Sequence, residues 1–146
     1  MSQPPELVLR RATAADVSVL TELNRQLIED QGHDNPATRV ELEERMRRWL
    51  SGGYSVGLFE CADVPVAYAV WREDDDGIYL RQLFVVRGQR RHGIGRQAFT
   101  LLRRQWNTDE VKLDVLLHNE RALAFWRSLG FRDYALILRL QPEGAT

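Results

Sequence analysis

A short basic segment with two glycines stands between an apolar run and an amphipathic run. No Asp or Glu occurs between positions 77 and 108. If the amphipathic run is a helix, its N-terminus, with free N–H groups and a partial positive charge, lies at this segment. Gly93 and Gly95 have no Cβ, so a ligand can come close to the backbone there. We therefore predict a phosphate or pyrophosphate site; the alternative is a tightly packed helix N-terminus with solvated arginines. The arginines are Arg87, Arg90, Arg91 and Arg96.

The flanking runs predict the elements that position this segment. Residues 78–86 are apolar, aromatic and β-branched, with no Gly or Pro, which is typical of a buried strand. The following run predicts a helix, so the order is strand, basic turn, helix. Its apolar residues at helical spacing are Ile94, Ala98, Leu101, Leu102 and Trp106.

Two segments of the chain resemble motifs of one enzyme family. Arg90-Arg91-His92-Gly93-Ile94-Gly95 matches the Arg/Gln-x-x-Gly-x-Gly/Ala signature of the GNAT superfamily of N-acetyltransferases, which bind acetyl-CoA. Residues 119–131 are similar to the family's Asn-x-x-Ala-x-x-Phe-Tyr-x-x-x-Gly-Phe segment. Both occur in the family's order, and the resemblance extends over about residues 7–140.

The resemblance implies an α/β fold of the GNAT type. We expect a mixed, mostly antiparallel sheet, splayed between its fourth and fifth strands and flanked by about four helices. A length of 146 residues fits one domain with its own core. We therefore expect a single GNAT-like domain over residues 1–146, with residues 1–5 and 141–146 as frayed tails.

Hydrophobic periodicity and capping signals give the order of elements. Thr13 with Asp16, and Thr38 with Glu41, resemble capping boxes that begin two helices. The first is expected to end near Gly32 and the second at Gly52; the arginines at 45, 47 and 48 are expected on its solvated side. The predicted strands are 6–11, 54–60, 65–71, 78–86, 111–117 and 131–140, the last as one strand or a pair; a further helix follows Asn119.

The resemblance also assigns the binding of acetyl-CoA. The backbone N–H of Leu83 would donate to the acetyl carbonyl, backbone groups of Val85 would pair with the pantetheine arm, and the glycine turn would hold the pyrophosphate. Asn119 matches the family's Asn, and its alternative role is a helix N-cap. The full expected set is Leu83, Phe84, Val85, Arg90, Arg91, His92, Gly93, Ile94, Gly95, Arg96, Asn119, Phe125 and Trp126.

The acid and the base of the reaction each have more than one candidate in the sequence. Trp126 stands where many members of the family carry a Tyr that protonates the leaving thiolate, and an indole N–H is not a usable acid. Either the thiolate leaves unaided, since its pKa lies near 8.5, or Tyr134 or Tyr79 serves. Glu29, near the end of the first helix, is a candidate general base, as are Asp30 and His33, directly or through water; the alternative is that all three are solvated loop charges.

Arg81 on the central strand is expected to face the acceptor. A guanidinium there would bind a carboxylate on the acceptor; the alternative is an ion pair with Asp74, Asp75 or Glu29. Asp30 and His33 lie in a region that helps to shape the acceptor site in this family. Strand alternation is expected to place Tyr79, Arg81, Leu83 and Val85 on one side and Leu80, Gln82 and Phe84 on the other.

The sequence as a whole favours an N-acetyltransferase acting on a primary amine of a small molecule or protein. A non-catalytic acyl-CoA-binding module is the alternative. The net charge of −1 and the single short basic stretch argue against nucleic acid. Cys61 as the one cysteine agrees with a cytoplasmic location, and we expect no membrane span and no metal site. The family resemblance also suggests a homodimer, for which Trp49, Trp71 or the last strand would supply the interface.

Overall fold

The computed structural model describes residues 6–30 and 37–141, apart from the side chains of residues 91 and 92. The chain divides into two compact units, Met1–Asp114 and Val115–Thr146. Each unit is described by itself. The first unit holds the sheet and the basic turn.

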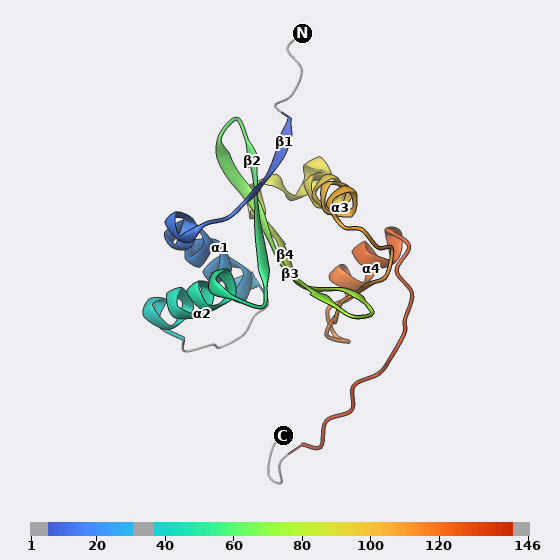
Figure 1. Ribbon diagram of the computed structural model, residues 1–146. Coiled ribbons are helices and arrows are strands. Elements are labelled where there is room, and N and C mark those ends of the chain that lie inside the picture. Colours follow the sequence, from blue (N-terminus) through green and yellow to red (C-terminus); the bar gives the residue numbers. More distant parts are fainter. Residues whose placement is uncertain (1–5, 31–36, 142–146) are drawn as a thin grey trace. The chain divides into compact units, whose positions relative to one another are not determined.

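The sheet has five strands in the order β1-β2-β3-β4-β5 (Figure 1). Neighbouring strands from β1 to β4 run antiparallel, and β4 and β5 run parallel. This is the mixed, mostly antiparallel sheet that the sequence resemblance implies. The strands are β1 (Leu7–Arg11), β2 (Ser55–Cys61), β3 (Val64–Asp74), β4 (Gly77–Val85) and β5 (Val111–Lys112).

The helices of the first unit are α1 (Val17–Asp30), α2 (Arg39–Ser51) and α3 (Ile94–Gln105). Both predicted capping residues are found in place. The backbone N–H of Thr13 donates to the Asp16 carboxylate at 2.8 Å, within the short 3-10 helix η1 (Ala14–Asp16) that precedes α1. Thr38 accepts from the backbone N–H of Glu41 at 3.2 Å. These bonds satisfy N–H groups that a helix start leaves unpaired.

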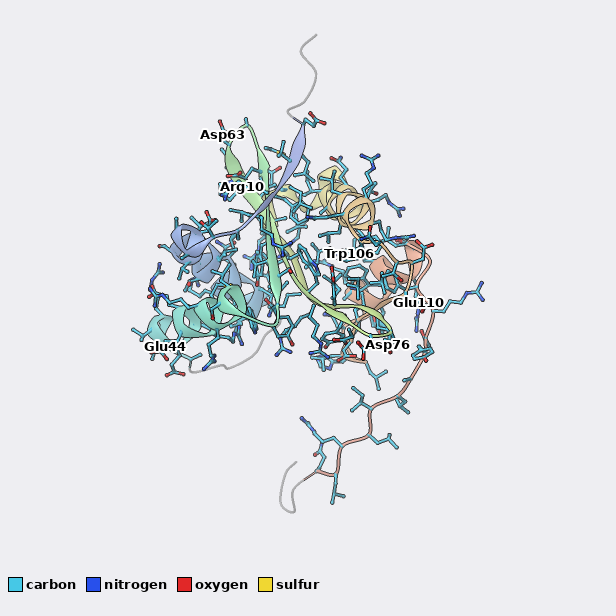
Figure 2. All side chains as sticks on the ribbon, viewed as in Figure 1. Arg10, Glu44, Asp63, Asp76, Trp106 and Glu110 are labelled. Carbon is cyan, nitrogen blue, oxygen red and sulfur yellow. The ribbon has the colours of Figure 1, made fainter. Side chains whose placement is uncertain are left out.

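The sheet of this unit is covered on both faces (Figure 1). On the α1–α2 face, Leu20 and Met46 pack with Tyr68, Val70 and Phe84 in one buried cluster. On the α3 face, the ring of Trp106 contacts the rings of Trp71 and Phe99, with centroids 5.9 and 6.1 Å apart. Figure 2 shows Trp106 on this side of the sheet. Burial of these rings fixes α3, and hence the basic turn, against the central strands.

A β-bulge changes which residues of β4 share a face. Val70 lies opposite Gln82, but the next residue, Trp71, lies opposite Leu80. Arg81 is therefore the extra residue, which reverses the alternation on either side of it. The predicted alternation is wrong here, because it assumes a regular strand: Tyr79 shares the α1–α2 face with Gln82 and Phe84, whereas Leu80 shares the α3 face with Leu83 and Val85.

The sheet opens between β4 and β5. These strands pair only at Ile78 with Val111 and at Tyr79 with Lys112, so among the described residues no strand covers the same edge of β4 beyond Tyr79. The predicted strand over 111–117 is accordingly wrong in length. The loss of pairing is the splay that the sequence resemblance implies.

The second unit contains α4 (Glu120–Ser128) and an extended segment after it. The Asn119 side chain caps α4 by accepting from the backbone N–H of Ala122 at 3.1 Å. The predicted strand over 131–140 is wrong for the described chain, because a strand needs a ladder with a neighbour and none forms there. Its large apolar side chains after Phe131 are exposed, with Tyr134 86% and Leu140 97% accessible.

Candidate active site

The basic turn has the geometry of an anion site. Residues Arg87–His92 form a 3-10 helix, η2, and Gly93 follows in the left-handed conformation, with φ 72°. Apart from its chain neighbours, no described residue has an atom nearer to a Cβ at Gly93 than the Gln97 amide nitrogen at 3.9 Å, so the described residues leave this face of the turn open. The backbone N–H of Gln97 donates to the Gly93 carbonyl at 3.1 Å. Ile94 and Gly95 come before Gln97 in the first turn of the helix, where backbone N–H groups have no acceptor within the helix. Their N–H groups are of the kind that binds anions.

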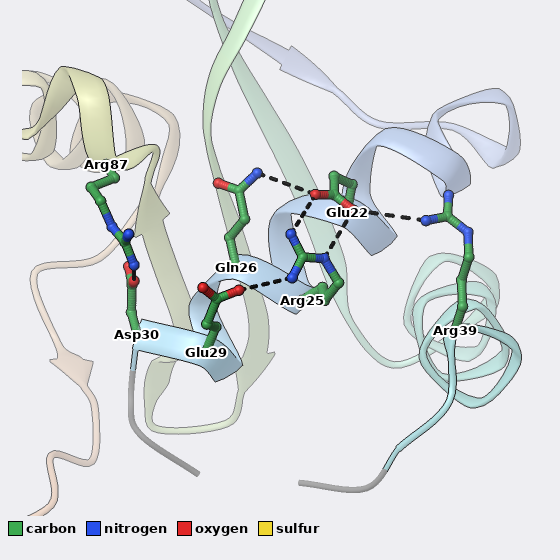
Figure 3. A network of polar contacts seen from close by, with 7 residues as sticks. All are labelled: Glu22, Arg25, Gln26, Glu29, Asp30, Arg39 and Arg87. Carbon is green, nitrogen blue, oxygen red and sulfur yellow. Dashed lines mark hydrogen bonds and ion pairs between the residues drawn. The ribbon is translucent and has the colours of Figure 1, made fainter. Parts of the chain in front are cut away.

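Two arginines of the turn are tied to the end of α1. The Asp30 carboxylate accepts from Arg87 and from Arg90, and Figure 3 shows the pair with Arg87. Arg90 also donates from Nε to the Val85 carbonyl at 2.9 Å. Burial on its own raises the pKa of the Asp30 carboxyl, but the hydrogen bonds from Arg87 and Arg90 outweigh it and lower the pKa below its usual value.

The other residues expected near the acceptor lie differently. Glu29 forms an ion pair with Arg25 at 2.8 Å, one turn away on α1, and both side chains are more than half exposed (Figure 3). His33 lies outside the described residues, as do the side chains of Arg91 and His92. Asp30 holds the basic turn, and its use in binding an acceptor stays a prediction.

The end of β4 presents backbone groups to the open edge. The N–H of Val86 donates to the Val66 carbonyl at 2.9 Å, so the residues opposite each other there form a hydrogen-bonded pair. Such pairs alternate along an antiparallel ladder. The N–H groups of Leu83 and Val85 therefore point away from β3, toward the edge that β5 leaves unpaired. An N–H at this edge can donate to an incoming carbonyl oxygen.

Tyr79 is held by an acidic partner. Its hydroxyl donates to the Asp114 carboxylate at 2.8 Å, and the Arg72 guanidinium lies 4.6 Å from the centre of its ring. Burial first, and then the bond to Asp114, raise the pKa of the Tyr79 hydroxyl. Both effects hold the phenolic proton more firmly.

The predicted site residues of the second unit contact one another. Trp126 packs between Phe125 and Phe131, with ring centroids 4.9 and 5.3 Å away. The N-cap role expected of Asn119 is confirmed. The cofactor contacts expected of Asn119, Phe125 and Trp126, and the acid role of Tyr134, stay predictions.

The structure reveals a polar network that the sequence analysis missed. On the α1–α2 face, the Asn24 amide donates to the Tyr68 hydroxyl at 2.9 Å, and that hydroxyl donates to Gln82 at 2.7 Å. Arg45 donates to the Asn24 amide oxygen and lies 4.8 Å from the ring centre of Trp49. The prediction of a solvated Arg45 is wrong.

The sequence spacing of α2 does indicate that Arg45 is partly buried. Arg45 lies three residues after Leu42 and four before Trp49, on the same helical stripe as these buried residues. A charged residue on such a stripe contacts the neighbouring element. Arg47 and Arg48, off the stripe, are exposed as predicted.

A comparison with protein families decides the class. The model of the acetyltransferase (GNAT) family matches residues 19–131. The chain belongs to the GNAT acetyltransferase family. It is accordingly an acyltransferase, and the glycine turn and the open edge of β4 lie inside the matched region. No curated protein matches this GNAT chain by sequence.

Solved structures share the GNAT fold at low identity. A possible acetyltransferase from Clostridium difficile 630 has a TM-score of 0.78 at 19% identity, over 93% of this chain and 97% of its own. The aminoglycoside N-acetyltransferase AAC(6')-Iy in complex with CoA has a TM-score of 0.78 at 13% identity, over 98% and 99%. An aminoglycoside acetyltransferase from an uncultured soil metagenomic sample, in complex with sisomicin, has a TM-score of 0.73 at 18% identity, over 93% and 95%.

The described helices of this GNAT protein include none with the length and apolar character to span a membrane.

Proposed function

We propose that this protein moves an acetyl group from acetyl-CoA to a primary amine of a small molecule or protein, by direct transfer in a ternary complex. The observation that carries the proposal is the pairing of an open glycine turn at a helix start with an unpaired N–H at Leu83, on consecutive elements. CoA in the AAC(6')-Iy complex and the amines of aminoglycoside acceptors in the neighbours support this donor and acceptor class.

The residues present fit the donor. The missing Cβ of Gly93 leaves open the space in front of the turn, and the backbone N–H groups of residues 92–96 would hold the pyrophosphate, aided by Arg90, Arg91 and Arg96. The pantetheine amides would pair with the edge of β4 at Val85. Bound there, acetyl-CoA supplies an activated acetyl group.

The N–H of Leu83 would stabilise negative charge as it develops on the acetyl oxygen. The amine attacks as the free base, since an ammonium has no lone pair. A carbon–nitrogen bond forms, the carbon–sulfur bond breaks, and the proton that the amine loses passes to water and balances the charge of the departing thiolate. Because Tyr79 is committed to Asp114, the thiolate leaves unaided or is protonated by Tyr134; its pKa near 8.5 makes unaided departure feasible.

The test is a panel of primary amines, with acetyl-CoA as donor and free thiol as the readout. Release of CoA together with a product heavier by one acetyl group supports the proposal. Tight binding of acetyl-CoA without CoA release for any amine would show a binding module instead. Release at the same rate without an amine would show hydrolysis.

A further inference from the structure

Two arginines from different elements converge on the ring of Trp49. Arg45 of α2 lies 4.8 Å from the centre of that ring, and Arg81, the bulge residue of β4, lies 5.4 Å from it. Arg81 also lies 5.7 Å from the ring centre of Tyr54. The bulge brings about this arrangement, because it turns Arg81 to the α1–α2 face beside α2.

Neither arginine has a carboxylate partner among the described residues. Arg45 bonds to the Asn24 amide, and Arg81 to the Tyr54 hydroxyl at 3.4 Å. Of the three acids expected beside Arg81, Asp74 pairs with Arg72 and Glu29 with Arg25, and among the described residues no ion pair joins Asp75 to Arg81. By contrast, three other arginines of α1 and α2 pair with glutamates, namely Arg25, Arg39 and Arg47.

Of the two arginines, Arg45 loses more free energy if its charge is not neutralised. Its side chain is half-buried, and within the described part of the chain its buried Nε has no hydrogen-bond partner. Burial lowers the pKa of Arg45, and the positive charges of Arg81 and Arg48 act in the same direction. Removing a cation from water without a counter-charge is unfavourable, so an anion arriving here gains more than it would at a solvated arginine.

The arginines are close to the proposed point of transfer. Arg81 precedes Leu83 by two residues, which is about 7 Å along a strand. Asn24 holds Arg45 and is itself held by Tyr68 and Gln82, so the guanidinium is positioned by a buried network. The site is therefore built on packed elements.

We propose that Arg45 and Arg81 bind a carboxylate on the amine acceptor, which makes the substrate an amino acid or a related amino carboxylic acid. The inference rests on the proposed function and deepens it. A planar guanidinium matches a carboxylate with two parallel hydrogen bonds. An aminoglycoside carries several ammonium groups and would meet the two arginines with charge of the same sign.

The test compares amine acceptors that carry a carboxylate with amine acceptors that lack one. The standard amino acids, their C-terminal amides and neamine are offered with acetyl-CoA, and thiol release gives kcat/KM for each. We expect the best acid to exceed its amide by about tenfold or more, the effect of a charged hydrogen-bonded pair. In Arg81→Gln this preference disappears, mainly through KM, whereas the matched control Arg47→Gln, on the solvated side of α2, keeps it.

The second variant, Arg45→Gln, is expected to behave like Arg81→Gln, provided that thermal unfolding shows it folded. Equal rates for acids and amides, or preference for neamine, would overturn the carboxylate site while leaving acetyl transfer intact. If no amine releases thiol, the same acids and amides are titrated calorimetrically into the protein saturated with CoA, or into the protein alone should acetyl-CoA fail to bind. Acid binding that needs Arg81 supports the site, and its absence overturns it.

Discussion

Asp30, the last residue of α1, is paired with Arg90, which lies sixty residues later in the basic turn. Arg90 in turn bonds the Val85 carbonyl at the end of β4. One carboxylate thus joins the end of α1 to the turn that is proposed to hold the pyrophosphate. The relationship makes the geometry of the turn depend on a residue outside the family signature.

Replacement of Asp30 by Asn should therefore lower stability. The side chain of Asp30 is 17% exposed and accepts from two arginines, so we expect a loss of about 1–2 kcal/mol in the free energy of unfolding. The matched control is Glu29→Gln, which breaks an exposed pair worth at most about 0.5 kcal/mol. Urea unfolding measures the loss of stability in both variants, provided that the dependence of the free energy on urea concentration is unchanged. Equal losses in the two variants would contradict the account.

The same pair predicts a pH dependence. The pKa of the Asp30 carboxyl is lowered in the folded protein. Its contribution to the free energy of unfolding is therefore complete above the unfolded pKa of about 3.9, and it falls as the pH drops through the folded pKa. The stability gap between the natural protein and Asp30→Asn should be constant from pH 7 to 5 and shrink below about pH 4. A gap that widens in acid would show that another group is responsible.

A separate prediction concerns the turn that begins β4. Gly77 has φ 133°, and a Cβ there would lie 2.3 Å from the Glu110 carbonyl oxygen, to which Ile78 donates. Gly77→Ala should cost about 2 kcal/mol or more, through strain and the shift of β5 that it forces. Gly52→Ala is the control, because Gly52 has extended backbone and open space; thermal unfolding should hardly change. Equal shifts in Tm would refute the contact.

The Asn119 cap allows a test within the second unit. Asn119→Ala should cost about 1 kcal/mol, the usual value for a lost N-cap. Asn119→Ser should keep most of that stability, since a hydroxyl caps as well. If the alanine and serine variants both lose acetyl-CoA affinity while only alanine loses stability, the amide also serves the cofactor.

Local signals in the sequence predicted much of the first unit. The caps at Thr13 and Thr38, the two strands β2 and β3, and the strand–turn–helix around Gly93 follow from residue type and spacing. These features depend on contacts a few residues apart, which a pattern can report.

The parts that failed depend on residues far apart in the chain. The bulge at Arg81 is set by the register of β3 against β4, and no local pattern encodes it. The burial of Arg45 depends on its amide partner on another helix. The extent of the strand after Val111 depends on which neighbour supplies a ladder.

The most direct measurement is calorimetric titration of acetyl-CoA into the natural protein and into Gly93→Glu. Gly93→Ala isolates the strain of the left-handed backbone, and Gly52→Glu isolates the added charge. The account predicts that the natural protein and Gly52→Glu bind acetyl-CoA, that ATP does not bind, and that the folded Gly93→Glu loses affinity by far more than Gly93→Ala. Equal affinity of Gly93→Glu and Gly52→Glu would show that the glycine turn does not hold the cofactor.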